Sequence, residues 1–141
     1  MDIYTLVATV SLVLQIAILI LLFGSLTLKN KKKFRQHGIT MLIAVALHTT
    51  SILAVMIPSF AAIGSANLAA TISSIAYIHG ITGILAEIFG VLIIASWRLR
   101  TSLQYCAPKK KLMRLTLVFW IIALFLGILL YLHFYTTLLP L

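Results

Sequence analysis

Long apolar segments alternate with short polar ones along the whole chain. The apolar segments run over residues 3–28, 37–57, 69–97 and 112–139. Each is as long as the ~20 residues that a helix needs to cross a bilayer. The pattern predicts an all-α membrane protein, namely a four-transmembrane-helix antiparallel bundle that forms a single membrane domain over residues 1–141. The connections between the segments are too short to predict a separate soluble domain.

The basic residues lie where apolar segments end. All eleven Lys and Arg residues fall within residues 29–35 and 98–114, and the chain is 62% hydrophobic. The positive-inside rule places both basic loops in the cytoplasm. We therefore expect a multi-pass protein of the cell membrane with both termini, and the connection over residues 58–68, outside. The basic residues form no stripe on a soluble surface, so the net charge of +9 does not indicate a nucleic-acid partner.

Few side chains are available for chemistry. Cys106 is the single cysteine, and Asp2 and Glu87 are the two acidic residues. These counts exclude an iron–sulfur cluster held by this chain alone, and the absence of C-x-x-C-H excludes covalently attached c-type haem. Paired carboxylates, a Ser-His-Asp set and a glycine-rich phosphate loop are also missing. The sequence thus predicts an electron-transfer or accessory protein rather than a stand-alone enzyme.

Three histidines, His48, His79 and His133, fall inside predicted membrane helices. An ionisable side chain at that depth costs about 2.5 kcal/mol or more unless it faces the bundle interior, a partner or a cofactor. Imidazole is a common metal ligand and a frequent axial ligand of haem iron. Helix rise puts His79 and His133 at a shared level, ~28–30 Å from the basic rim. They are the predicted axial ligands of a haem b, with His48 as a further candidate for binding the cofactor and its iron.

Small residues follow His79 along one helix face. Gly83, Ala86 and Gly90 recur at steps of three and four residues, which is the spacing of one helical stripe. A groove of this kind can hold a flat ring, and we name these residues as cofactor-binding candidates. Ordinary close packing of membrane helices explains the same pattern equally well.

A second level of polar residues is expected near mid-membrane. His48 and Glu87 should both lie ~17–20 Å from the basic rim, where they are candidates for proton handling. Gln15 and Ser11 could join the same interior network or form a plain interhelical hydrogen bond. His37, beside the first basic cluster, is expected to be an interfacial residue in contact with lipid headgroups or water.

Part of the chain resembles a family of small four-helix membrane proteins of bacteria and archaea. The residues that carry the likeness are KKKFRQHGITMLIAVALHTTSILAVMIPSF, YIHGITGILAEIFGVLIIASWRLR and a last helix with LGILLY. The family is largely uncharacterised, and members of the CtaM type are implicated in maturation of haem-containing terminal oxidases. The resemblance implies haem-related work and carries over to His37 and His79. The family's further histidine before the last helix is missing from APKKKLMR.

Three functions remain open at this point. The first is a b-type haem protein that transfers electrons between a quinone-like carrier and an outer-side partner, such as an extracytoplasmic cytochrome or oxidase subunit. The second is an accessory protein that handles haem or assembles an oxidase. The third is a proton-coupled transporter or complex subunit without haem. Glycine-rich helix faces also allow a homo-oligomer.

Overall fold

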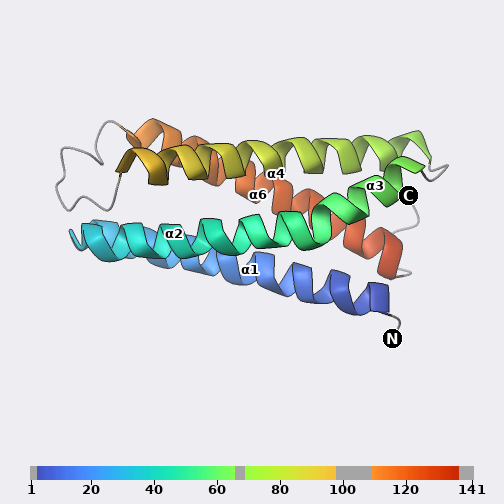
Figure 1. The fold of residues 1–141 in the computed structure, drawn as a ribbon, viewed down its shortest axis with the longest axis horizontal. Helices are drawn as coiled ribbons and strands as arrows, with labels where there is room; N and C mark the ends of the chain where they lie inside the picture. Colours follow the sequence, from blue (N-terminus) through green and yellow to red (C-terminus); the bar gives the residue numbers. More distant parts are fainter. Residues whose placement is uncertain (1–2, 66–68, 98–108, 137–141) are drawn as a thin grey trace.

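The computed structural model describes residues 3–65, 69–97 and 109–136. These residues form four long helical units that run back and forth, which confirms the predicted all-α four-helix bundle (Figure 1). The elements are α1 (Ile3–Asn30), α2 (Phe34–Ser51), the π-helix η1 (Ile52–Met56), α3 (Ile57–Ser65), α4 (Ala70–Trp97) and α6 (Lys110–Tyr135). Residues 137–139, which were expected to extend the last helix, lie outside the described residues.

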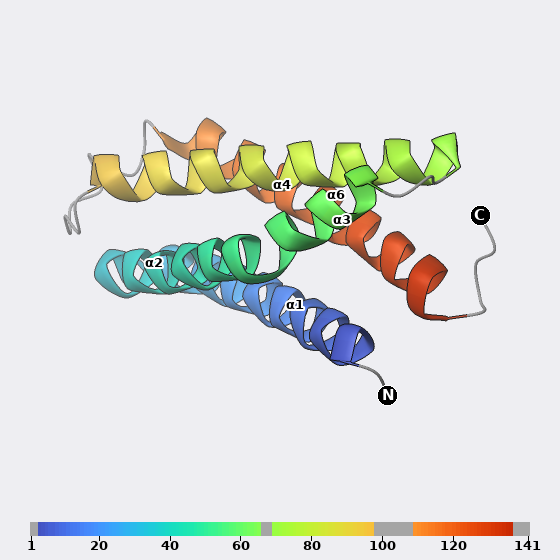
Figure 2. The ribbon, with the colours of Figure 1, turned by 45° about the vertical axis from the view of Figure 1, so that its right-hand side comes forward.

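The bundle is built from two helix pairs. α1 packs along α2, and α4 packs along α6. α6 is inclined to α4, and its far end approaches α1 (Figure 2), where Tyr131 and Thr9 share a hydrogen bond of 2.8 Å. Trp120 of α6 lies in the hydrophobic core at the centre of the bundle. It packs there with side chains of the other three helices, namely Ile18, Leu22, Ala44, Val45 and Ala86.

A tight turn joins the first helix pair. Lys32 has a φ of 58°, and its backbone N–H donates to the Lys29 carbonyl while that of Lys33 donates to the Leu28 carbonyl, both at 3.0 Å. A left-handed residue with these two bonds is the Schellman motif, which satisfies the last carbonyls of a helix. The chain therefore reverses within three residues, and the predicted loop of residues 29–35 is mostly helical.

The second membrane helix continues further than the sequence predicts. The apolar pattern predicts an end at residue 57 before a loop over residues 58–68, but η1 and α3 carry the helix on to Ser65. Pro58 lies in the first turn of α3, where a missing N–H is tolerated. The wide π-helical turn before it redistributes the backbone bonds that an α-helix would lose, as π-bulges do. The unit bends there (Figure 2).

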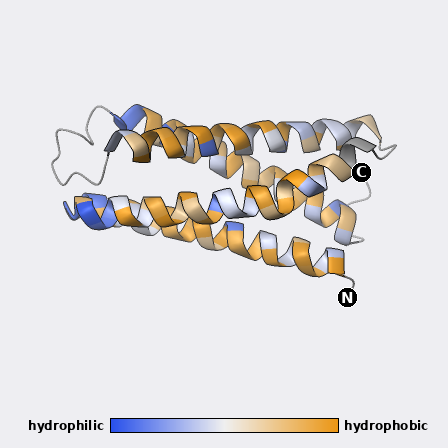
Figure 3. Cartoon of the chain, in the orientation of Figure 1, coloured by the Kyte–Doolittle hydropathy of each residue, from blue (hydrophilic) through white to orange (hydrophobic). Residues whose placement is uncertain are grey.

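Four helical units are long and apolar enough to cross a membrane: Ile3–Asn30, Phe34–Ala62, Ala70–Trp97 and Lys110–Tyr135. The protein is therefore a multi-pass membrane protein whose exposed apolar side chains face lipid. Hydrophilic residues gather at one end of the bundle (Figure 3). We call this the basic end; its described basic residues lie in the α1–α2 turn and at the start of α6. Which end is cytoplasmic stays a prediction.

Candidate functional site

The structure brings His48 and Glu87 together in the middle of the bundle. His48 Nδ1 lies 2.7 Å from Glu87 Oε2, and the two side chains are 1% and 14% exposed. Both residues sit well inside their spans, His48 on α2 and Glu87 on α4. Because Glu87 Oε2 is the natural acceptor, the imidazole donates to it through Nδ1–H when Glu87 is ionised. We refer to these two side chains as the His48–Glu87 pair.

Thr49 completes the hydrogen bonding of the carboxyl group. Its hydroxyl contacts Glu87 Oε1 and also lies 2.9 Å from the carbonyl oxygen of Val45 on its own helix. A threonine hydroxyl has one hydrogen to donate and two lone pairs that accept. It can therefore donate either to the carboxylate or to the Val45 carbonyl, and in the second case it accepts from a protonated Glu87.

Trp120 covers the other side of the pair. The centroids of the His48 and Trp120 rings are 4.6 Å apart, at an interplanar angle of 52°. Trp120 is 2% exposed, so its indole excludes water and lipid from this face of the imidazole. Low local dielectric strengthens the hydrogen bonds of the pair and makes any unpaired charge there costly.

A second polar group follows on the side away from the basic end. Gln15 Nε2 donates to Ser51 Oγ at 3.1 Å, and Ser11 Oγ lies 3.4 Å from the same atom. Ser51 comes three residues after His48, about one helical turn, and directly before the π-helix η1. The Gln15 and Ser11 side chains expected in the interior thus bind α2 one turn beyond the pair.

His79 is held by the last helix. Its Nδ1 lies 2.8 Å from the backbone carbonyl oxygen of Ala123 on α6, and a carbonyl can only accept, so Nδ1 carries the proton. The ring packs over Gly127, where an added Cβ would lie 3.0 Å from His79 Cε1. Histidines that bind metals commonly donate one ring nitrogen to a carbonyl in this way, which orients the other nitrogen as a ligand.

The predicted partner of His79 does not lie opposite it. His133 follows Gly127 by six residues, which is about 9 Å further along α6, and its ring contacts Phe134 at a centroid distance of 5.0 Å. His79 thus meets α6 at Ala123 and Gly127 and not at His133, and beyond these residues the far end of α6 leaves α4 and approaches α1 (Figure 2).

The predicted iron ligands do not converge as a set of three. Across residues 3–65, 69–97 and 109–136, no group of three or more His, Cys, Asp or Glu side chains is placed to hold a metal ion. Nδ1 of His48 is engaged with Glu87, and Nδ1 of His79 with the Ala123 carbonyl. A haem held by two histidines stays a prediction.

The stripe of small residues on α4 serves helix packing over most of its length. Ala86 is fully buried in the core, and a Cβ added at Gly90 would lie 2.9 Å from a Val45 methyl group on α2. Of these three residues only Gly83 has open space beside it, with no heavy atom of a neighbour within 4 Å of an added Cβ. The groove expected for a flat ring is thus closed by the core at Ala86 and by Val45 of α2 at Gly90.

The prediction that His37 is an interfacial residue in contact with headgroups or water is corrected, because its side chain is buried inside the bundle and closed off from water and from the surrounding headgroup layer. Its side chain is 5% exposed because it lies against α1. His37 Nδ1 is 2.6 Å from Ser25 Oγ and 2.9 Å from the Ser25 carbonyl oxygen. The hydrogen bonds fix the ring, while Nε2 is buried and has no hydrogen-bond partner among the residues that the structure describes.

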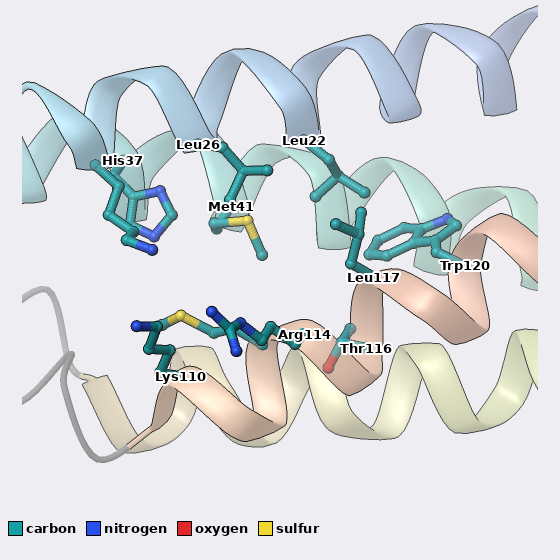
Figure 4. A pocket seen from close by; sticks show the side chains of 11 residues that line it. Leu22, Leu26, His37, Met41, Lys110, Arg114, Thr116, Leu117 and Trp120 are labelled. Atoms are coloured by element: carbon teal, nitrogen blue, oxygen red, sulfur yellow. The ribbon is translucent and has the colours of Figure 1, made fainter.

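A cavity of about 290 Å³ opens beside His37. Figure 4 shows its side chains, with His37 and Leu26 on one side and Lys110 and Arg114 of α6 across from them. Trp120, the residue that covers His48, also lines it. The cavity thus lies between the basic end and the covered face of the His48–Glu87 pair.

Sequence reasoning missed Thr49, Trp120 and Ser25 as parts of the site. Thr49 is adjacent to His48 in a run of polar residues, which is a signal for an interior face. Trp120 is expected from its residue type to belong to an aromatic belt near a span end, yet it lies ten residues after the start of α6 at Lys110 and in the core. Because Trp120 lies this far from the start of the helix, its position in the sequence could have identified it as a core residue.

No protein-family model matches the chain, and neither the curated proteins nor the solved structures contain a significant match. The resemblance to the CtaM type stays a prediction.

Proposed function

We propose that this protein handles protons inside the membrane, as a proton-coupled transporter or as a subunit of a larger membrane complex. The His48–Glu87 pair is the exchanging site. One observation carries the proposal: the side chains around Glu87 can satisfy its carboxyl group both with and without a proton.

The ionised state uses two donors. His48 Nδ1–H donates to Oε2 and the Thr49 hydroxyl donates to Oε1. The protonated state uses the same atoms in another order. Glu87 donates its proton to the Thr49 oxygen, and the Thr49 hydrogen turns to the Val45 carbonyl 2.9 Å away. A buried polar group without a partner costs about 1–3 kcal/mol, so a site that avoids this cost in both states favours exchange.

A cavity lies on one side of the His48–Glu87 pair, and a group of hydrogen-bonded polar side chains lies on the other side. The cavity leads from the basic end to Trp120, which contacts His48. Towards the other end, Ser51 binds Gln15 and Ser11. Intramembrane acids and histidines commonly form proton relays in pumps and transporters, and this arrangement of side chains supports that class of function.

Infrared difference spectroscopy of the purified full-length chain in liposomes tests the proposal. Asp2 and Glu87 are the only acidic side chains, so an Asp2→Asn background leaves the Glu87 side chain and the terminal carboxyl group. We expect a protonated-carboxyl signal that changes when the pH of the medium is varied over a wide range and that disappears in Glu87→Gln. The glutamine keeps an acceptor for His48, so the loss reports the proton rather than unfolding.

Two threonines provide a matched comparison. Thr49→Val should alter the pH dependence of this signal, because it removes the hydroxyl that serves both states. Thr82→Val should leave it unchanged, since the Thr82 hydroxyl binds only carbonyls of its own helix, at 2.8 and 3.0 Å. A carboxyl signal that stays constant over the whole range would show that Glu87 is a structural hydrogen-bonding residue and would refute proton exchange.

Haem handling is the second candidate, and His79 is the residue that favours it. The bond between His79 Nδ1 and the Ala123 carbonyl is the type that orients a histidine as an axial ligand. A single histidine in this geometry suits an accessory protein that holds haem transiently and helps assemble an oxidase. A stable electron-transfer haem b, exchanging electrons with a quinone-like carrier and an outer-side cytochrome, would need His133 or His48 as the second ligand.

A visible spectrum of the reduced, purified protein separates these possibilities. Stoichiometric Soret and α bands that are lost in both His79→Ala and His133→Ala would support electron transfer. Substoichiometric haem that exchanges readily and depends on His79 alone would support assembly. If the bands are absent after reconstitution with haem, both haem functions are refuted, whereas the Glu87 titration is unaffected by that result.

A further inference from the structure

The cavity near the basic end combines an apolar interior with cations at its rim. Its deeper walls are formed by apolar side chains that include Leu26, Leu117 and the indole of Trp120. Lys29, Lys110 and Arg114 line the same cavity; Lys110 and Arg114 are exposed, whereas Lys29 is half-buried. A site with this division of chemistry fits a molecule that has an acidic head and an apolar tail.

His37 supplies an independent sign of a missing ligand atom. It lines the cavity and is 5% exposed. Within residues 3–65, 69–97 and 109–136, its Nε2 has no hydrogen-bond partner. Buried polar side-chain atoms in proteins are almost always hydrogen-bonded, so an exception calls for a specific explanation. In Figure 4 the His37 ring lies across the cavity from Lys110 and Arg114, so a group bound between them can supply the partner.

The hydrogen bonding of His37 suits an anionic oxygen. Nδ1 lies 2.9 Å from the Ser25 carbonyl oxygen, which can only accept, and the Ser25 hydroxyl donates to the His37 carbonyl at 3.2 Å, so Nδ1 carries a proton. Nε2 donates to an anionic oxygen when the ring takes up a second proton and becomes an imidazolium. An anion bound beside the ring stabilises that charged form.

We propose that this cavity binds an anionic phospholipid from the leaflet at the basic end. The phosphate is held by Lys29, Lys110 and Arg114 and accepts a hydrogen bond from His37 Nε2, and one acyl chain extends along Leu26 and Leu117 towards Trp120. A volume of about 290 Å³ is at the lower end of the range for small-molecule sites, ~300–1,000 Å³. It has room for part of one chain and not for a whole lipid. Basic pockets between membrane helices bind acidic headgroups by the same electrostatics.

Native mass spectrometry of the full chain in detergent tests the assignment. The probes are phosphatidylglycerol and phosphatidylcholine with identical acyl chains, and inorganic phosphate. We expect phosphatidylglycerol to bind about thirtyfold more tightly to the native chain than to Lys110→Gln/Arg114→Gln, since each basic residue near a membrane surface contributes about 1 kcal/mol towards acidic lipid and 1.4 kcal/mol is tenfold.

Lys31→Gln/Lys33→Gln is the matched control. It removes the same charge at the same end of the bundle, but these residues are exposed in the α1–α2 turn and do not line the cavity. It should leave the affinity within about twofold. Equal losses in the two double variants would mean that the basic end attracts acidic lipid only as a charged surface, and would overturn the proposal.

Two further variants test the interior. His37→Ala should weaken phosphatidylglycerol binding because it removes the Nε2 donor to the phosphate, and Leu26→Phe should block the acyl chain and weaken binding of both lipids, while circular dichroism reports that each variant remains folded. If the native chain binds the two lipids equally well, the site does not select an anionic headgroup and the proposal is wrong. If inorganic phosphate competes as well as the lipid does, the cavity does not hold an acyl chain and the proposal is equally wrong.

Discussion

Gly38 lies directly under the indole of Trp97, and replacing it with alanine should destabilise the bundle. An ideal Cβ at position 38 would lie 1.5 Å from Trp97 Cη2, 1.8 Å from Cζ3 and 2.2 Å from Cζ2. Ordinary carbon contacts are about 3.5–4.0 Å, so the indole has to move by roughly 2 Å or the helices have to separate. Trp97 is 6% exposed and has little free space to move into.

The expected effect is a loss of about 2 kcal/mol in the free energy of unfolding. Overpacking of a filled site costs about 1–3 kcal/mol, and complete loss of a buried tryptophan side chain costs about 3–5 kcal/mol. The better helix propensity of alanine returns up to about 1 kcal/mol. The sum of these effects therefore stays clearly destabilising.

Gly24 offers a matched control because nothing lies within 4 Å of a Cβ built there. We expect Gly24→Ala to be neutral or up to about 1 kcal/mol more stable. The free energy of unfolding is measured in bicelles by steric trapping, read out as binding of the trapping protein, and the Trp97 emission is followed separately for Gly38→Ala in a Trp120→Phe background. In the double variant Gly38→Ala/Trp97→Ala, the methyl group added at position 38 no longer meets an indole, so the two substitutions should couple by about 2 kcal/mol.

A specific result would refute this packing. If Gly38→Ala is as stable as Gly24→Ala and the Trp97 emission is unchanged, the indole does not cover Gly38 and the arrangement of α2 against α4 at the basic end is wrong. Destabilisation without coupling to Trp97 would instead locate the clash elsewhere.

Two smaller predictions concern the α1–α2 turn and His79. Lys32→Gly should raise the free energy of unfolding by about 1 kcal/mol, because glycine adopts the left-handed conformation without the ~1–2 kcal/mol penalty of other residues; an unchanged value in chemical denaturation would argue against the observed turn. Gly127→Ala brings a Cβ to 3.0 Å from the His79 ring and should break the bond to the Ala123 carbonyl. The His79 ¹⁵N chemical shifts should then lose the fixed Nδ1–H tautomer, at a cost of about 0.6 kcal/mol; unchanged shifts would show that the ring is held in another way.

The four membrane helices can be predicted directly from the length of the apolar segments and from the basic residues at their ends. Predicted and observed boundaries agree within about three residues for α1 and α4 and at the start of α2 and α6, because charged residues cannot enter the bilayer cheaply. The predicted far end of the second unit is wrong. A proline ordinarily favours a helix end, but a π-helical turn next to Pro58 preserves the helix.

The depth of each polar residue in the membrane can also be predicted from the helix rise, but the neighbouring helix that its side chain faces cannot. His48 and Glu87 are expected at one level and meet there. His37 is expected at an interface and is buried against Ser25, because the tight turn at Lys32 presses α2 onto α1. Depth is a property of one helix, whereas a contact depends on two helix axes and their rotation.

The amino-acid sequence alone therefore determined that the chain is a four-helix membrane protein. It also determined that ionisable side chains lie at mid-membrane depth, where burying them costs free energy. Hydrophobic length and charge act locally and need no knowledge of neighbours. The tertiary structure decided which polar residues meet: His48 with Glu87 and Thr49, His79 with the Ala123 carbonyl, and His37 with Ser25. Those choices depend on the inclination of α6, the π-helical bend after Ser51 and the close approach at Gly38, which arise only when the four helices pack together.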